Sequence, residues 1–226
     1  MWLLNSSIGK KVVMSLTGLF LILFLTFHMS MNLVAIFSAE GYNAVCEFLG
    51  ANWYALAGTA VIAAGAVLHI LFALWLTYIN RRARGKDRYK VSERPKEVEW
   101  ASQNMLVLGI IVVIGIALHL YQFWFKMQFN EITGILPEVN PHDGYALIAE
   151  TLGNPIMAVI YLVWFAAIWF HLTHGFWSAI QTLGWNNKIW LSRWKCISNI
   201  YSTIVVVCFA LVVVVFFVKS LACGAC

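Results

Sequence analysis

Five long apolar stretches dominate the sequence, at residues roughly 12–37, 53–80, 101–126, 155–183 and 197–221. An α-helix needs about 20 apolar residues to cross the hydrocarbon core of a bilayer, and each stretch reaches that length. Inside lipid, every backbone N–H and C=O group must find a partner within the protein, which a helix provides by itself. The sequence therefore predicts an all-α integral membrane bundle of five transmembrane helices.

Composition agrees with this class, because only 11% of the residues are charged, whereas soluble domains carry roughly a quarter. We expect residues 1–226 to form a single domain with short connections at 38–52, 81–100, 127–154 and 184–196. The net charge of +5 is better explained by membrane topology than by nucleic-acid binding, so no nucleic-acid partner is expected.

The basic residues indicate the orientation. Thirteen of the 15 Lys and Arg residues fall before the first span or in the second and fourth connections, which lie on one side. Only Lys126 and Lys219 fall on the other side, together with Glu40, Glu47, Glu131, Glu138, Asp143 and Glu150. Since cytoplasmic segments carry the excess of Lys and Arg, the N-terminus is predicted to be cytoplasmic and the C-terminus external.

Histidines are the most informative polar residues. Five of the six lie inside spans: His28, His69, His119, His171 and His174. An ionisable side chain in a membrane is costly and marks a functional site, although an interhelical hydrogen bond is an alternative role. The span centres contain no Asp, Glu, Lys or Arg, so neutral imidazoles that bind a metal fit better than a proton relay. His142, between Pro141 and Asp143, is expected to be solvated.

Depth along the helices groups four of these histidines into two layers. At about 1.5 Å per residue, His28 lies roughly 24 Å and His119 roughly 21–27 Å from the cytoplasmic ends of their spans. By the same count, His69 lies about 15 Å and His171 about 18 Å from the cytoplasmic ends of their spans. Each layer thus holds two imidazoles on different helices, which is what bis-histidine ligation of a haem iron requires. His174, one turn from His171, competes with it for this role.

Glycines one turn from three of the histidines suggest room for a flat porphyrin, or else ordinary close helix packing. These are Gly65, Gly115 and Gly175, whereas His28 has Phe24 and Asn32 at the equivalent positions. Five scattered cysteines show neither zinc spacing nor a Cys-x-x-Cys-His haem-attachment motif. The terminal Cys223 and Cys226 are either an ordinary tail or a disulfide.

Several stretches together match a known family: Ser15-Leu-Thr-Gly-Leu-Phe20 through Phe27-His28-Met29, His69, His119-Leu-Tyr121, and Phe170-His-Leu-Thr-His-Gly-Phe-Trp177. Over essentially its whole length the chain resembles the five-helix, di-haem cytochrome b membrane-anchor subunit of succinate dehydrogenases and fumarate reductases. The resemblance implies that His69 and His171 ligate an inner haem b, and His28 and His119 an outer one. The family motif favours the first histidine of His-x-x-x-Gly, and hence His171 over His174.

The resemblance also implies partners. A flavoprotein and an iron–sulfur subunit would dock on the cytoplasmic face of a bacterial inner membrane, where the basic segment Arg81–Lys96 fits either docking or topology. Menaquinone would react near the outer haem, with Glu47, or failing that Glu40, as the acidic residue of the quinone site. Trp169 stands where some relatives carry a glutamate of a transmembrane proton path. A dimer of the complex is a further expectation.

Three other functions fit the same spans. Another respiratory complex, such as a nitrate reductase or hydrogenase, also uses a di-haem anchor that oxidises quinol. A haem-free transporter would line a substrate path with polar residues, but the absence of central acids and interrupted helices disfavours it. A purely structural anchor would use the histidines as hydrogen-bonding groups. The direction of the reaction is not predicted.

Overall fold

A computed structural model describes residues 6–84 and 99–223. It is 88% helical, and these ranges contain no strand. Five helices are long and apolar enough to cross a membrane: Ser7–Phe37, Trp53–Ala83, Met105–Thr133, Pro155–Thr182 and Lys188–Ala222. The predicted all-α architecture with five spans is confirmed, and the chain is a multi-pass membrane protein.

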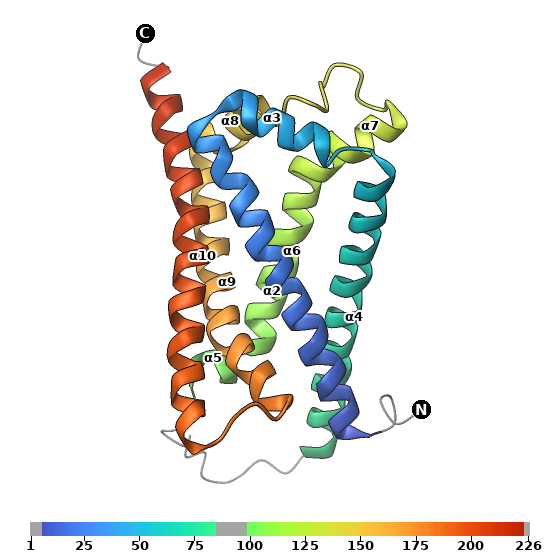
Figure 1. Cartoon of the computed structure of the whole chain (residues 1–226), viewed down its shortest axis with the longest axis vertical. Helices are drawn as coiled ribbons and strands as arrows, with labels where there is room; N and C mark the ends of the chain where they lie inside the picture. The colour runs from blue at the N-terminus through green and yellow to red at the C-terminus, as the bar shows by residue number, and fades with distance from the viewer. Residues whose placement is uncertain (1–5, 85–98, 224–226) are drawn as a thin grey trace.

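Four spans are single helices: α2 (Ser7–Phe37), α4 (Trp53–Arg84), α9 (Pro155–Thr182) and α10 (Lys188–Cys223) (Figure 1). Polar side chains set where they begin. The Ser6 hydroxyl accepts the Gly9 N–H at 2.9 Å, and Asn154 accepts the N–H groups of Ile156 and Met157 before α9. Such capping supplies partners for N–H groups that have none inside the helix.

The third span is divided. It runs through α6 (Met105–His119), the π-helix η1 (Leu120–Phe129) and α7 (Asn130–Thr133), and the short helix α5 (Trp100–Gln103) precedes it. The sequence predicted one helix over 101–126, and neither the break at Asn104 nor the π-helix was expected. A π-helix bonds each residue to the fifth one along, and such segments are frequent at functional sites. Here it begins directly after His119.

Two short helices, α3 (Ala39–Phe48) and α8 (Gly144–Gly153), lie across one end of the bundle, in segments predicted only as connections. Ser38 caps α3 by accepting the Gly41 N–H at 2.9 Å, and Asp143 caps α8 by accepting the Ala146 N–H. One face of each is buried against the spans, through Tyr42 of α3 and Leu147, Ile148 and Leu152 of α8.

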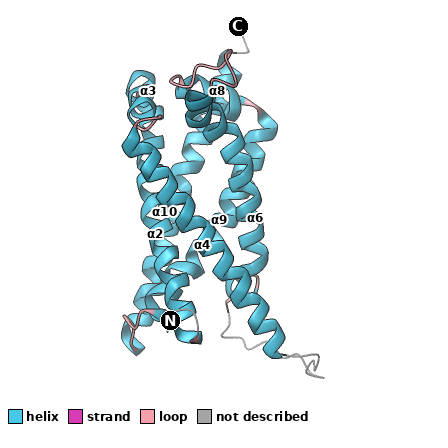
Figure 2. Cartoon of the chain, turned by 90° about the vertical axis from the view of Figure 1, so that its right-hand side faces the viewer, coloured by secondary structure: helices cyan, strands magenta, loops and turns pink. Residues whose placement is uncertain are grey.

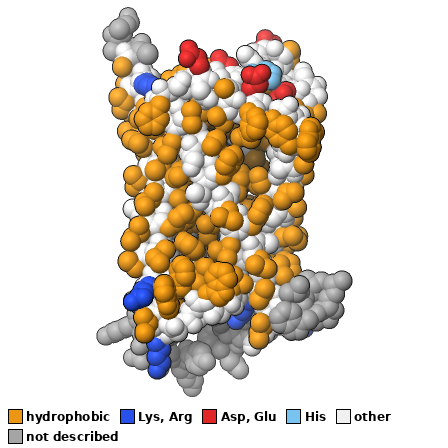
Figure 3. Space-filling view, in the orientation of Figure 1, with side chains coloured by type: hydrophobic (Ala, Val, Ile, Leu, Met, Phe, Trp, Pro, Cys, Tyr) orange, Lys and Arg blue, Asp and Glu red, His pale blue; other side chains and the backbone are white. Residues whose placement is uncertain are grey.

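The two ends of the molecule differ in charge, as Figure 3 shows. The end where α2 begins and α4 ends, called the basic end below, carries Lys and Arg side chains, and the opposite acidic end carries Asp and Glu. Between them the visible surface is mostly apolar. Figure 2, turned by 90°, shows the spans running between these ends.

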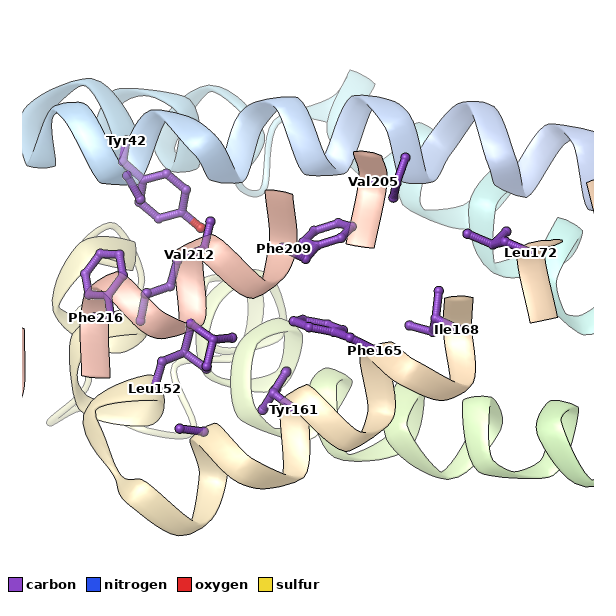
Figure 4. Close-up of a cluster of buried hydrophobic side chains, with 14 residues drawn as sticks. Tyr42, Leu152, Tyr161, Phe165, Ile168, Leu172, Val205, Phe209, Val212 and Phe216 are labelled. Atoms are coloured by element: carbon purple, nitrogen blue, oxygen red, sulfur yellow. The ribbon is translucent and has the colours of Figure 1, made fainter. Parts of the chain in front are cut away.

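Packing is tight on one side of the bundle and loose on the other. The main hydrophobic core joins α8, α9 and α10 through residues such as Leu152, Phe165, Phe209 and Phe216 (Figure 4). In the apolar windows of α9 and α10, 33% and 28% of residues are buried, against 6% in each of the other three spans. The loosely packed spans α2, α4 and α6 carry three of the histidines discussed below.

Candidate functional site

The structure brings the four predicted ligands together as two pairs. His28 of α2 and His119 of α6 have ring centroids 5.7 Å apart, and His69 of α4 and His171 of α9 have ring centroids 6.4 Å apart. Two imidazoles that share a metal at about 2.0 Å from each nitrogen have ring centres about 6 Å apart. Both pairs of rings therefore lie at the separation that two imidazole ligands of one metal ion require.

Both pairs also join helices that make few other contacts with each other. In the described chain α2 packs closely on α4 and α9, and α9 on α6 and α10, but neither α2 with α6 nor α4 with α9 forms such a contact. The histidine rings are a contact between the two helices of each of these pairs.

The pairs are two-ligand sites. No group of three or more His, Cys, Asp or Glu side chains that could hold a metal ion occurs among residues 6–84 and 99–223. Zinc usually takes three or four protein ligands, whereas haem iron already has its porphyrin and needs only axial ligands. The donor set therefore fits haem better than a bare ion.

Hydrogen bonds fix the orientation of two of the rings. His69 Nδ1 lies 3.2 Å from the Thr17 hydroxyl, and His119 Nδ1 lies 3.4 Å from the hydroxyl of Tyr161, which is only 3% exposed. Histidines that bind metals commonly engage their second nitrogen in this way, which orients the ring and sets its tautomer. In both rings Nδ1 is thus engaged by a hydroxyl of another helix, and Nε2 remains available to a ligand.

The rings of His171 and His28 do not have a hydroxyl partner of this kind. His171 Nδ1 is buried and has no hydrogen-bond partner in the described chain, an arrangement that costs free energy unless another group binds there. His28 instead has Asn32 Nδ2 3.4 Å from its Nε2, so a ligand at that nitrogen would displace a weak contact. His28 also stacks on Phe24, with centroids 5.4 Å apart.

Aromatic side chains occupy the space beside two glycines where the sequence suggested room for a porphyrin. A Cβ on Gly65 would lie 2.7 Å from the Phe20 ring, and one on Gly115 would overlap the Trp164 indole. Trp164 also lies beside His119 and donates its N–H to the Val112 carbonyl. At these two positions close helix packing, the alternative explanation, describes the structure better.

His174 is turned away from the inner pair. Its Nδ1 lies 3.6 Å from Glu99 Oε2, longer than a hydrogen bond, and its ring meets Trp177 edge-on. Glu99 forms a closer ion pair with Lys195, at 2.7 Å. Burial acts to raise the pKa of the Glu99 carboxyl, but Lys195 and then His174 together lower that pKa below its ordinary value. His171, rather than His174, faces His69.

The predicted quinone-site acids lie at the acidic end without contact to the histidines. Glu40 and Glu47 are both exposed on α3. The more engaged carboxylate is Glu131, which sequence reasoning did not single out and which accepts the Ala51 N–H at 2.9 Å. Beside it, the buried Gln128 donates to the Gly50 carbonyl at 2.8 Å. These two side chains tie the third span to the start of α4.

Three remaining predictions have simple outcomes. His142 lies in a turn before α8, where its N–H donates to Asn140. Trp169, in place of a proton-path glutamate, donates its indole N–H to Thr203 at 3.0 Å. The loop part of the segment Arg81–Lys96 and the Cys223–Cys226 pair lie outside the residues whose side chains are described.

Comparison with known proteins adds no relative. No protein-family model matches the chain, and searches of curated proteins and of solved structures found no significant match. Function must therefore be argued from the histidine geometry and from the sequence motifs.

Proposed function

We propose that the chain is the membrane anchor and di-haem cytochrome b subunit of a succinate:quinone oxidoreductase, of the succinate dehydrogenase or fumarate reductase kind. The observation that carries the proposal is that four histidines from four different spans face one another in two pairs. The contacts of His69 and His119 with the Thr17 and Tyr161 hydroxyls support it further. The choice of complex rests on the sequence resemblance.

In this proposal His28 and His119 hold the iron of an outer haem b, and His69 and His171 that of an inner one. Haem b supplies one-electron oxidation and reduction within the membrane. Thr17 and Tyr161 orient the ligating rings, and the aromatic side chains around them keep water away. Exclusion of water and the surrounding polarity are the means by which a protein adjusts a haem potential.

The basic end is then cytoplasmic, in a bacterial inner membrane, and receives the flavoprotein and iron–sulfur subunits. Dicarboxylate chemistry belongs to those subunits, and menaquinone reacts at the acidic end. An electron that crosses the bilayer also couples to the membrane potential, at about 2.3 kcal/mol per charge per 100 mV. The anchor thus conducts electrons between the iron–sulfur subunit and quinone.

Purification of the tagged chain from its own membranes tests this assignment. Co-purification of a flavoprotein and an iron–sulfur subunit, with b-type absorbance that succinate reduces, is the expected result. Reduction by quinol alone, with other soluble subunits, would instead make the chain the anchor of a different respiratory complex. A reduced-minus-oxidised spectrum without b-type bands would point to a transporter or a structural anchor.

Glu47 is proposed to exchange protons with quinol at the acidic end, as a carboxylate at a membrane edge is able to do. Glu40, also exposed on the same short helix, provides a matched control. Glu47→Gln should lower quinol turnover while haem content stays intact, and Glu40→Gln should leave both unchanged. Equal turnover in the two variants would remove Glu47 from the proposal.

A further inference from the structure

Helices α2 and α4 interlock through two reciprocal contacts, each between a glycine of one helix and a ring of the other. A Cβ on Gly18 of α2 would lie 3.2 Å from His69 Cε1 of α4. A Cβ on Gly65 of α4, one turn before His69, would lie 2.7 Å from the Phe20 ring of α2. Glycine leaves the space of a Cβ free for close approach, so each ring lies where a larger residue would crowd it.

Helix α4 depends on α2 for its rotation about its own axis. Among the described elements α4 packs closely on α2 alone, beside which it lies in Figure 1. On its other sides near the imidazole, Val67, Leu68 and Leu71 are 53%, 45% and 56% exposed. Because the rotation and crossing angle of a helix follow from the side chains on which it packs, the surface of α2 decides where His69 points.

The His69 ring meets α2 along one edge. Its Nδ1 lies 3.2 Å from the Thr17 hydroxyl, and the adjacent ring atom Cε1 lies against Gly18. The plane of the ring makes an angle of 69° with the plane of the His171 ring. A side chain at position 18 would push this edge away from α2, lengthen the contact with Thr17 and change the angle to His171.

We propose that Gly18 is a positioning residue for His69, which carries no ligating atom itself but fixes how close the imidazole lies to α2 and how it is turned toward His171. Phe20 and Gly65 hold α4 in the same rotation one turn away. The inference rests on the proposed function, because its consequence is the ligand geometry of the inner haem. It also gives a physical role to Gly18 and Phe20 within the stretch 15–20, which carries part of the sequence resemblance.

A double-mutant cycle in the full chain tests this contact with a readout that does not require haem. Gly18→Val should lower the Tm by at least about 2 °C, because the added methyl groups overpack the contact with His69. In a His69→Ala background, where the opposing ring is removed, the same substitution should change the Tm by less than about 1 °C. Gly58→Val on α4 is the matched control, since nothing lies within 4 Å of its added Cβ, and its effect should be the same in both backgrounds. Equal losses for Gly18→Val in the two backgrounds would overturn the proposal.

Electron paramagnetic resonance of the oxidised, haem-loaded chain gives the second readout, because the signal of a low-spin haem depends on the relative orientation of its two axial imidazoles. Gly18→Val should shift the signal of the inner haem and weaken its binding about tenfold, while the signal of the outer haem stays as in wild type. Gly58→Val should match wild type for both haems. An unchanged inner signal, or equal changes in both signals, would overturn the positioning role. Absence of haem from wild type would instead refute the proposed function, and the cycle would still decide whether Gly18 positions His69.

Discussion

His69 Nδ1 lies 3.2 Å from the Oγ1 of Thr17, across the contact between α4 and α2. The Thr17 hydroxyl already directs its single proton to the backbone carbonyls of Val13 and Met14, at 2.9 and 3.0 Å. With its proton on either carbonyl, the oxygen is able to accept from His69, and in that tautomer the imidazole proton is on Nδ1 and Nε2 keeps a free lone pair. The ring as a whole lies opposite His171, with centroids 6.4 Å apart.

Thr17→Val tests this relationship, because it keeps the shape of the side chain and removes the acceptor. Loss of a partner that orients a metal-binding histidine typically costs about 10–100-fold in affinity. We expect the inner haem to be bound more weakly by that factor, as measured by haem retention during dilution, while the outer haem is retained normally. Thr17→Ser should behave like wild type. Tight inner-haem binding in Thr17→Val would show that the hydrogen bond does not prepare the ligand.

Single histidine replacements separate the two sites. His69→Ala or His171→Ala should remove the inner haem, and His28→Ala or His119→Ala the outer haem, each leaving one haem per chain. His174→Ala is the matched control on the same helix, since its ring faces Glu99 and Trp177, and it should retain both haems. If His174→Ala loses a haem while His171→Ala keeps two, the ligand assignment on α9 is wrong.

Gly115→Ala tests the packing of the third span on α9. An added methyl group would overlap the Trp164 indole, and overpacking of this kind typically costs about 1–3 kcal/mol. Gly58→Ala on α4 is the control, because nothing lies within 4 Å of its added Cβ and alanine favours a helix by up to about 1 kcal/mol. Thermal unfolding followed by circular dichroism should show a lower Tm for Gly115→Ala only. An equal Tm for the two variants would contradict the packing seen at Trp164.

The Glu99 ion pair predicts a dependence on pH. Because Lys195 keeps the pKa of this carboxyl below its ordinary value of 4.5 in the folded chain, ionised Glu99 adds stability above about pH 4.5. That contribution disappears as the pH falls through the lowered pKa. Glu99→Gln should therefore lower the Tm by about 1–2 °C at pH 7, the value of an exposed ion pair.

In an acid titration below pH 4.5, the difference in Tm between wild type and Glu99→Gln should shrink and vanish once Glu99 is protonated in the folded chain. Glu138→Gln removes a carboxylate that is exposed and forms no ion pair in the described chain, and it should match wild type throughout the titration. A Glu99→Gln deficit that persists undiminished at low pH would mean that the residue acts by packing.

Much of the fold was predictable because lipid leaves few alternatives. Long apolar runs specify spans, and the observed helices extend beyond the predicted ones where polar residues continue the helix outside the hydrocarbon. The last span, for example, begins at Lys188 instead of 197, after Asn187 caps its first N–H groups. The helices α3 and α8 were missed because ten residues with a single buried face give a weak periodic signal.

Within the candidate site, the histidine pairing followed from depth alone, because rise per residue is nearly constant in a helix. The hydrogen-bond partners of the imidazole rings could not be predicted from the sequence. Thr17 and Tyr161 come from helices other than those of the histidines they contact, and rotation about a helix axis is set by tertiary packing. The glycine argument failed at Gly65 and Gly115 for the same reason, since nothing in their own span reveals that Phe20 and Trp164 lie opposite.

The haem-to-protein ratio of the purified chain tests the central claim most directly. Pyridine haemochrome absorbance, set against quantitative amino-acid analysis, should give two haem b groups per chain, one for each facing histidine pair. A preparation that is folded by circular dichroism yet contains no haem, or only one, would contradict the account.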